Sequence, residues 1–272
     1  MLGWWEAVFL GFIQGLTEFL PVSSSGHLAI AEYFLGIKTG LSFDIFVHLG
    51  TLVAVTLYFW RDLIREYKTL WLPLVVATIP AVVVGFFTKD WIEQIRLDML
   101  ALSVCYALTA LLLGISAVLL QTTPREGRLS KAFASMRNWL DSKRNVYDHP
   151  TLLQAFLVGI FQALALLPSV SRSGSAVSGG LIVGLKPETA FRFAFLISIP
   201  AIGGAILLDV FELFQSGEAM SIPWPQYILA TVVSGVVGFG ALALLQWFMQ
   251  KRLIWPFAVY CLVVSVLLLF FV

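Results

Sequence analysis

The feature that most constrains this chain is a polar stretch at residues 14–27, set between two apolar arms. Its sequence is QGLTEFLPVSSSGH, which brings together a carboxylate, an imidazole and three serine hydroxyls. The whole chain is 59% hydrophobic and only 12% charged, whereas about 25% of the residues of soluble proteins are charged. We therefore predict an integral membrane protein. Polar groups at membrane depth are tolerated mainly where protein or a water-filled cavity surrounds them, so residues 14–27 are a candidate functional site.

A second, weaker copy of this stretch lies at residues 162–175, with the sequence QALALLPSVSRSGS. One fixed offset pairs Gln14 with Gln162 and Gly26 with Gly174. The same offset pairs further residues on both sides, namely Gly11 with Gly159, Leu16 with Leu164, Val22 with Val170, Ser23 with Ser171, Ser25 with Ser173, Gly36 with Gly184, Lys38 with Lys186, and Phe43 with Phe191. We interpret this as an internal duplication, because unrelated turns share composition but not a register this long.

Each polar stretch interrupts an apolar segment that is too short to cross a bilayer. The arms at residues 2–20 and 27–36 are broken at Pro21 and the serines, and neither has the roughly 20 uninterrupted apolar residues of a transmembrane helix. A second broken segment covers residues 151–185. We therefore predict two re-entrant helix–loop–helix hairpins, each of which enters and leaves the membrane on one face.

Six longer apolar segments complete the predicted fold, at residues 44–60, 70–88, 99–120, 189–208, 226–248 and 253–271. We expect an all-α integral membrane protein with a first repeat at residues 1–120, a basic linker at 121–150 and a second repeat at 151–272. A re-entrant hairpin adds no net crossing, and three spans add an odd number. The two repeats must therefore be inverted, an architecture found among transporters.

The distribution of Lys and Arg predicts the orientation. Most of the 17 basic residues fall on one face of this topology, in the segments 61–69, 121–150, 185–192 and 249–252. The other face holds Lys38, Lys89 and Arg96, so the positive-inside rule makes the first face cytoplasmic. We expect a plasma (inner) membrane protein with a cytoplasmic linker, both termini outside, and a site open to the extracytoplasmic face. The net charge of +1 argues against binding of nucleic acid.

Arg172 is the basic residue predicted to lie inside the membrane, at the tip of the second hairpin. A lone arginine there costs roughly 2.5–3.5 kcal/mol on insertion scales, so it should have an anionic partner. That partner is either Glu18, in a structural ion pair, or a phosphate, whose oxygens match the paired donors of a guanidinium. Helix starts after Gly26 and Gly174 would add backbone N–H donors. The pattern predicts a phosphate site shared by both hairpins.

The first polar stretch carries the candidate chemistry. Ser24 and His27 are three positions apart, so Ser24 could be a nucleophile activated by His27, or His27 could act as an acid or base on a water. A serine here is also commonly just a helix cap. Glu18 follows Gln14 by one helical turn, and carboxylate and amide oxygens suit a divalent cation that substrate phosphates would complete.

The remaining polar and thiol groups are expected to be structural. His48, Asp44 and Asp209 lie near the ends of predicted segments, where an interfacial position is sufficient. Cys105 and Cys261 fall inside apolar segments and are predicted to be buried free thiols.

The two hairpin motifs resemble those of the undecaprenyl-diphosphatase family, the bacitracin-resistance membrane phosphatases. The resemblance rests on residues 14–27 and on PSVSRSG at residues 168–174, and covers nearly the whole chain in the length and order of segments. It implies hydrolysis of undecaprenyl diphosphate to undecaprenyl phosphate and inorganic phosphate, which recycles the lipid carrier for cell-wall synthesis and gives bacitracin resistance. It also implies six spans, two re-entrant hairpins and a divalent cation, Mg²⁺ or Ca²⁺.

The resemblance also implies residue roles. Glu18 is associated with metal and catalysis, Ser24 and His27 match the nucleophile and its acid–base partner, and Arg172 holds the diphosphate. Gln14 stands where many members have a second glutamate, although the family pattern also admits glutamine. Glu18 and Gln14 are the expected metal ligands. Substrate contacts are expected from Gln14, Ser23, Ser25, Gly26, Ser171, Ser173 and Gly174.

The expected partners are a polyprenyl diphosphate lipid and the surrounding membrane lipid, and the sequence leaves open whether the chain forms a homodimer. Two other functions are compatible with the pattern. An inverted-repeat transporter or lipid-carrier flippase is the first, because broken helices also suit alternating access. A membrane module that binds anions without chemistry is the second.

Overall fold

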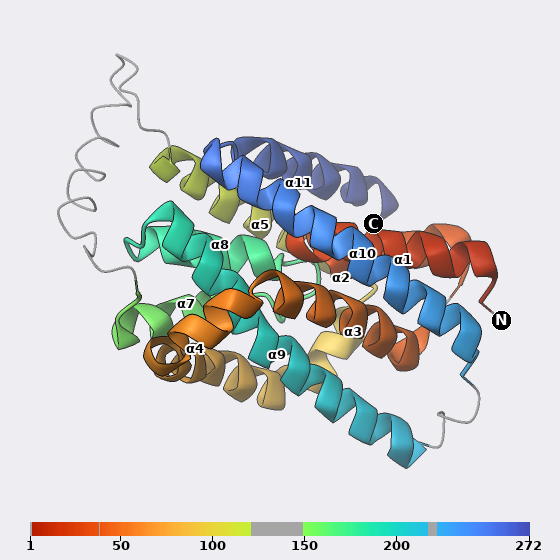
Figure 1. The fold of residues 1–272 in the computed structure, drawn as a ribbon. Helices are drawn as coiled ribbons and strands as arrows, with labels where there is room; N and C mark the ends of the chain where they lie inside the picture. Colours follow the sequence, from red (N-terminus) through yellow and green to blue (C-terminus); the bar gives the residue numbers. More distant parts are fainter. Residues whose placement is uncertain (1, 38, 121–148, 217–221) are drawn as a thin grey trace.

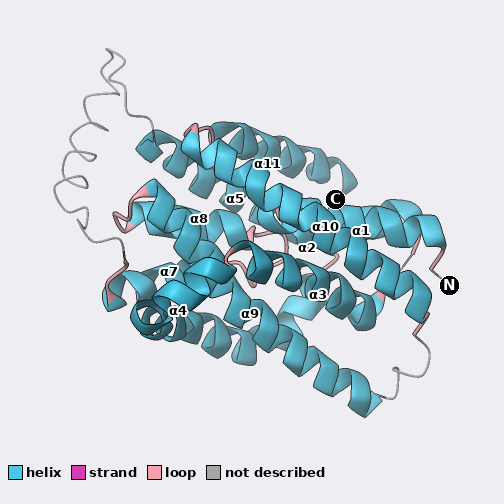
Figure 2. Ribbon diagram, viewed as in Figure 1, coloured by secondary structure: helices cyan, strands magenta, loops and turns pink. Residues whose placement is uncertain are grey.

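The computed structural model of the chain describes residues 2–37, 39–120, 149–216 and 222–272. Lys38 and nearly all of the predicted linker at 121–150 lie outside the described residues. In the described part, helices are joined by short loops (Figure 2). The first half forms α1 (Trp4–Phe19), α2 (Ser24–Leu35), α3 (Gly40–Tyr58), α4 (Trp60–Ile95) and α5 (Met99–Leu120). The second half forms α7 (Leu152–Leu164), α8 (Arg172–Ile182), α9 (Pro187–Ser216), α10 (Trp224–Gln250), α11 (Trp255–Leu268) and the short 3₁₀ helix η2 (Leu269–Phe271).

The first hairpin is formed by α1 and α2. α1 stops because Leu20 is extended, and a following proline, Pro21, disfavours helical backbone in the residue before it. Ser23 is the N-cap of α2, and its Oγ accepts a hydrogen bond from the Gly26 amide at 3.4 Å. This cap starts α2 at Ser24, three residues before the predicted start of the second arm.

The second hairpin, α7 and α8, repeats this local design. Ser171 is the N-cap of α8, and its Oγ accepts from the Gly174 amide at 3.1 Å. These two residues are the counterparts of Ser23 and Gly26 in the sequence duplication. The same serine cap therefore places the starts of α2 and α8 at equivalent positions of the two hairpins.

Helix packing follows a matching pattern in the two halves. α1 packs against α10, and α7 packs against α4, while α5 and α11 lie side by side (Figure 1). Close approach in the first two pairs depends on glycine. A Cβ on Gly11 would lie 2.7 Å from the backbone oxygen of Ala230, and a Cβ on Gly159 would lie 2.3 Å from that of Ala77. Gly11 and Gly159 are paired by the duplication, so both repeats use the same position to bring two backbones together.

Four stretches of the described helices are long and apolar enough to cross a membrane, namely Lys68–Thr88, Met99–Leu120, Pro187–Gln215 and Trp224–Gln250. α3 and the start of α4 meet at a bend of 58° and add a fifth if they are one span. α4 is a single helix of 36 residues that runs through Pro73 and Pro80, longer than the predicted span at 70–88. The coarse prediction of an all-helical, multi-pass membrane protein is confirmed.

The outer surface of the bundle is strongly apolar. Phe86, Phe87 and Phe270 are 82%, 79% and 81% exposed, which a protein surrounded by water would not sustain over so wide an area. Acyl chains are the natural cover for such a surface. Cys105 and Cys261 are buried free thiols, as predicted.

Candidate active site

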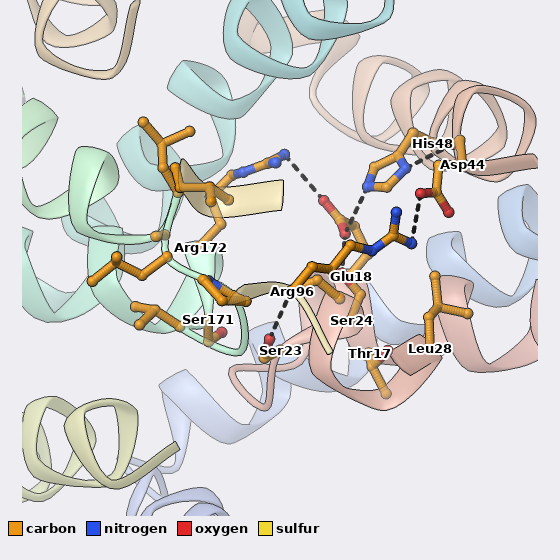
Figure 3. Close-up of a pocket in the computed structure, with 17 residues that line it drawn as sticks. Thr17, Glu18, Ser23, Ser24, Leu28, Asp44, His48, Arg96, Ser171 and Arg172 are labelled. Atoms are coloured by element: carbon orange, nitrogen blue, oxygen red, sulfur yellow. Dashed lines mark hydrogen bonds and ion pairs between the residues drawn. The ribbon is translucent and has the colours of Figure 1, made fainter. Parts of the chain in front are cut away.

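The tips of the two hairpins meet over a cavity of about 250 Å³ (Figure 3). Its wall is completed by α3 and by the α4–α5 turn. The lining residues are Thr17, Glu18, Ser23, Ser24, Ser25, Leu28, Asp44, His48, Ile92, Arg96, Ala165, Leu166, Leu167, Pro168, Val170, Ser171 and Arg172. The two polar stretches of the sequence are therefore brought together at one site.

Glu18 is the centre of this site, and its side chain is only 5% exposed. The Ser24 hydroxyl donates to its Oε2 at 2.5 Å, and the Gln14 amide donates to the same oxygen at 3.1 Å. The Arg172 guanidinium donates to Oε1 at 3.2 Å. A buried carboxylate is costly unless it is paired and hydrogen-bonded, and these three donors, from α1, α2 and α8, meet that requirement.

The ion pair with Glu18 occupies only part of the Arg172 guanidinium. Only Nη1 contacts Glu18, and the side chain is 29% exposed, toward the cavity that it lines. A guanidinium carries five N–H donors in a planar fork. Both partners considered for Arg172 are therefore compatible with the geometry, because it pairs with Glu18 and still presents donors to an anion in the cavity.

The sequence analysis missed three residues of the cavity wall. His48 and Asp44, for which an interfacial position was expected to be sufficient, line the cavity. The Arg96 guanidinium pairs with the Asp44 carboxylate at 2.9 Å. His48 and Asp44 are one helical turn apart on α3, and this spacing of two polar groups on an apolar helix was the available signal.

His27 is placed differently from its predicted role. Its Nδ1 lies 2.6 Å from the carbonyl oxygen of Ser23 and 3.0 Å from the Tyr106 hydroxyl, and its Nε2 lies 2.6 Å from the Tyr260 hydroxyl. His27 is not among the residues that line the cavity. The predicted contact between Ser24 and His27 is therefore not formed, because the tyrosines of α5 and α11 hold the imidazole while Ser24 turns to Glu18.

The other predicted contact residues divide into two groups. Ser23, Ser25 and Ser171 line the cavity. Gln14, Ser173, Gly26 and Gly174 do not line it. The last three have structural contacts. The Ser173 hydroxyl donates to the carbonyl oxygen of Leu20 at 3.2 Å, and a Cβ on Gly26 would lie 2.5 Å from the Tyr106 hydroxyl.

The donor set fits a divalent cation only in part. No group of three or more His, Cys, Asp and Glu side chains in the described part of the chain could hold a metal ion alone. However, Oε1 of Gln14 is fully buried and has no hydrogen-bond partner. The atom of Gln14 that contacts the Glu18 carboxylate is Nε2, not this oxygen. The unpaired oxygen is an acceptor that a cation beside Gln14, completed by substrate oxygens, would satisfy.

Comparison with known proteins shows the family of the chain. The family model described as bacitracin resistance protein BacA matches residues 7–267, which includes both hairpins. The chain belongs to the BacA family. Named relatives cover its whole length. An undecaprenyl-diphosphatase of Alteromonas mediterranea is 36% identical over 98% of both chains. One of Alcanivorax borkumensis is 36% identical over 99% of both. Undecaprenyl-diphosphatase 2 of Agrobacterium fabrum is 35% identical over 98% of this chain and 95% of its own.

Proposed function

We propose that this BacA-family protein is a membrane phosphatase that hydrolyses undecaprenyl diphosphate to undecaprenyl phosphate and inorganic phosphate. This reaction would recycle the lipid carrier for cell-wall synthesis and give resistance to bacitracin. The observation that carries the proposal is the buried Glu18 carboxylate. It accepts hydrogen bonds from Ser24 of the first hairpin and from Arg172 of the second. The names of the relatives favour hydrolysis over the transporter or flippase alternative.

Binding of the diphosphate would use the cationic groups of the cavity. Arg172 presents its guanidinium from the start of α8, and Arg96 lines the same cavity and pairs with Asp44. Helices α2 and α8 both begin at this cavity, and the partial positive charge at their N-termini favours an anion there. Ser23, Ser25 and Ser171 would add hydroxyl donors to the phosphate oxygens.

Ser24 is the group that we propose attacks the terminal phosphorus. Its hydroxyl already donates to Glu18, so the proton has an acceptor as the new oxygen–phosphorus bond forms. The anhydride bond to the prenyl phosphate breaks, and Arg172 stabilises the charge on the leaving group. Water then hydrolyses the phosphoserine and releases inorganic phosphate.

A divalent cation, Mg²⁺ or Ca²⁺, is part of this proposal. The cavity wall carries two carboxylates, Glu18 and Asp44, and two guanidiniums, Arg96 and Arg172, so their formal charges cancel. A diphosphate would therefore bring negative charge into a poorly solvated site without compensation. Glu18 and Gln14 would hold the ion, and the ion would neutralise charge on the phosphate oxygens.

For His27, which the resemblance made the acid–base partner of Ser24, the contacts support a proposal of a positioning role. Its Nδ1 bonds to the carbonyl oxygen of Ser23, the residue that precedes Ser24 and has a φ of 69°. A non-glycine residue rarely adopts such a backbone conformation unless its surroundings hold it there. We propose that His27, fixed by Tyr106 and Tyr260, helps to keep the Ser24 hydroxyl at Glu18.

We also propose the finer architecture of two inverted repeats, residues 1–120 and 151–272, with six spans and a cytoplasmic linker at 121–150. The matching pairs α1–α10 and α7–α4, and the equivalent caps Ser23 and Ser171, support it. Both termini and the cavity would face the extracytoplasmic side of the plasma membrane. Labelling of cysteines introduced at Gly3 and at Arg252 with a membrane-impermeant reagent, in intact cells, tests this: the first should react and the second should not.

The test of function is release of inorganic phosphate from undecaprenyl diphosphate by the purified protein in detergent, with and without Mg²⁺ or Ca²⁺. We expect cation-dependent release that is lost in Glu18→Ala and in Arg172→Ala. The matched controls Glu188→Ala and Arg65→Ala change the same residue types away from the cavity and should keep the wild-type rate. If the folded wild type releases no phosphate from this or shorter prenyl diphosphates, the proposal is wrong, and a transport assay in liposomes would test the alternative.

A further inference from the structure

The wall of the active-site cavity has an apolar side as well as a polar one. Its apolar lining residues are Leu28, Ile92, Val170 and residues 165–168. Three of these residues, Leu28, Pro168 and Val170, are buried. Ile92 and residues 165–167 are partly exposed. The apolar side of the cavity is therefore open at one turn of the second hairpin and at one residue near the end of α4.

This turn of the second hairpin is a departure from the sequence duplication. α1 continues to Phe19, but α7 ends at Leu164, three residues before the position that corresponds to Phe19. The amides of residues 165–167 each donate to the carbonyl oxygen three positions earlier, at 3.0–3.2 Å. These backbone donors are satisfied without a regular helix and without water, as a turn at membrane depth requires.

The equivalent part of the first hairpin is closed. Glu18 and Phe19 occupy the positions that correspond to Leu166 and Leu167. The Phe19 side chain is only 1% exposed, and its ring centroid lies 5.8 Å from that of Phe195 on α9. The first hairpin therefore packs its turn into the core, whereas the second leaves leucine side chains open beside the cavity.

α4 runs past this open turn. A Cβ on Gly85 would meet one atom within 4 Å, Cδ1 of Leu166, at 3.6 Å. Ile92 lies seven residues later, on the same face of α4 and about 10 Å away along the helix axis. Gly85 belongs to the apolar stretch Lys68–Thr88, and Ile92 lies beyond its end. Gly85, Ile92 and residues 165–167 thus form an apolar strip that leads from the cavity into the membrane-spanning part of α4.

The chemistry of the lipid decides what would occupy this strip. A polyprenyl diphosphate joins an anionic headgroup covalently to an apolar chain. If the headgroup binds at Arg172, the chain must leave the cavity without covering charged groups, because a charge that loses its water to an apolar chain is costly. The side of the cavity at α3 carries the ion pair of Asp44 with Arg96. The apolar strip avoids this cost and buries apolar surface of the chain instead.

We propose that the apolar strip is the binding site of the first isoprene units of the substrate, and that the prenyl chain passes along it between α4 and the turn of the second hairpin into the lipid. Leu166 and Gly85 would set the width of this path. The inference rests on the proposed function only in that the lipid is a polyprenyl diphosphate whose headgroup enters the cavity.

A second apolar groove provides the comparison for this path. It lies between α5 and α11, has a volume of about 720 Å³, and is lined only by Ala, Gly, Val, Leu and Ile side chains. None of its lining residues lines the active-site cavity. α5 and α11 also lie on a different side of the bundle from α4 and α7 (Figure 1). A chain attached to a headgroup in the cavity therefore reaches the apolar strip directly, but not this groove.

The experiment is photolabelling of the protein in lipid nanodiscs. The probe is a farnesyl diphosphate analogue with a diazirine on its first isoprene unit and a methylene bridge between the phosphates, which prevents hydrolysis. We expect label at Ile92 and residues 165–167 that unlabelled undecaprenyl diphosphate displaces. The inference is wrong if these residues carry no displaceable label, or if the displaceable label lies on α5 and α11.

Two glycine variants test the path by blocking it. Gly85→Leu places a branched side chain against Leu166, within the apolar strip. Gly114→Leu is its matched control, since Gly114 lines the groove between α5 and α11 and a Cβ there meets nothing within 4 Å. We expect the affinity for a methylene-bridged undecaprenyl analogue, measured by displacement of the label, to fall about tenfold or more in Gly85→Leu, the value of one misplaced methylene in an apolar site. Gly114→Leu should keep the wild-type affinity.

Thermal unfolding shows whether both variants fold. Equal affinities in the two folded variants, or a loss in Gly114→Leu alone, would overturn the inference. If Gly85→Leu does not fold, the position of the label in the wild type still decides the question.

These outcomes are separate from those of the phosphatase assay, because labelling requires no turnover. A protein that releases phosphate but carries its displaceable label elsewhere would retain the proposed function and refute this path. A protein that is labelled along the apolar strip but releases no phosphate would retain the path for the chain and refute the proposed function.

Discussion

Replacement of Ser24 by alanine distinguishes a direct attack by this hydroxyl from attack by water. The Ser24 hydroxyl donates to Oε2 of Glu18 at 2.5 Å and lines the cavity. The alanine removes both the candidate nucleophile and one hydrogen bond to the central carboxylate. Gln14 and Arg172 would still hold Glu18 in place, so the site should keep its shape.

The two mechanisms predict rate losses of different size. A hydrogen bond to a charged group is worth about 1.5–3 kcal/mol, so its loss alone would slow the reaction by roughly 10-fold to 150-fold. Loss of a nucleophile costs far more, on the order of 10⁶-fold in serine proteases, before residual catalysis by the rest of the site is reached. Because we propose that Ser24 attacks phosphorus, we expect kcat for Ser24→Ala to fall by at least about 10³-fold.

The assay is phosphate release under saturating undecaprenyl diphosphate, with thermal unfolding as the check on folding. Ser25→Ala is the matched comparison, since Ser25 lines the same cavity but bonds to Ser23 and to the Ser169 amide rather than to Glu18. Its loss should stay within about tenfold, the value of one ordinary hydrogen bond. Acid quenching with substrate labelled in the terminal phosphate should trap phosphoserine at Ser24. A folded Ser24→Ala that loses less than about 100-fold, with no trapped label in wild type, would refute nucleophilic attack by Ser24.

Three further outcomes follow from the geometry. Arg172→Lys should lower kcat by about 100-fold, because a point charge cannot replace the planar fork at the phosphate; a rate near that of Arg65→Lys would contradict this. Gly159→Ala should lower the free energy of unfolding by about 1–3 kcal/mol, since its Cβ would lie 2.3 Å from the Ala77 oxygen. Gly114→Ala, which meets nothing within 4 Å, is its control in thermal unfolding, and equal melting temperatures would refute the packing. EDTA should abolish phosphate release, and release that persists in excess chelator would exclude a cation requirement.

Local chemistry explains the features that the sequence predicted well. Pro21 and the following serines end one helix and start the next, whatever surrounds them, because a proline restricts the preceding residue and a serine caps the following helix. Arg172 needed an anionic partner at membrane depth, and Glu18 is that partner in the structure. Such requirements can be read from one segment at a time.

The features that the sequence did not predict depend on packing between distant segments. His27 is held by Tyr106 and Tyr260, which lie far away in the chain, so spacing within one helix could not reveal its orientation. His48 reaches Glu18 only because α3 packs beside the first hairpin. α4 continues through Pro73, where a proline would ordinarily end or kink a helix.

The two hairpins contribute different chemical groups to the site. The first hairpin supplies the carboxylate and the hydroxyl, at Glu18 and Ser24, while the second supplies a guanidinium at Arg172 and has Leu166 where the first has Glu18. A second carboxylate at that position would face the same cavity and repel a diphosphate. A second arginine in the first hairpin would compete with the cation for the Glu18 carboxylate. Phosphoryl transfer, the reaction that we propose, requires mainly positioning and stabilisation of negative charge around the phosphorus. Under the proposed duplication, the two copies serve this reaction because they supply unlike groups, a carboxylate and a hydroxyl from one and a guanidinium from the other.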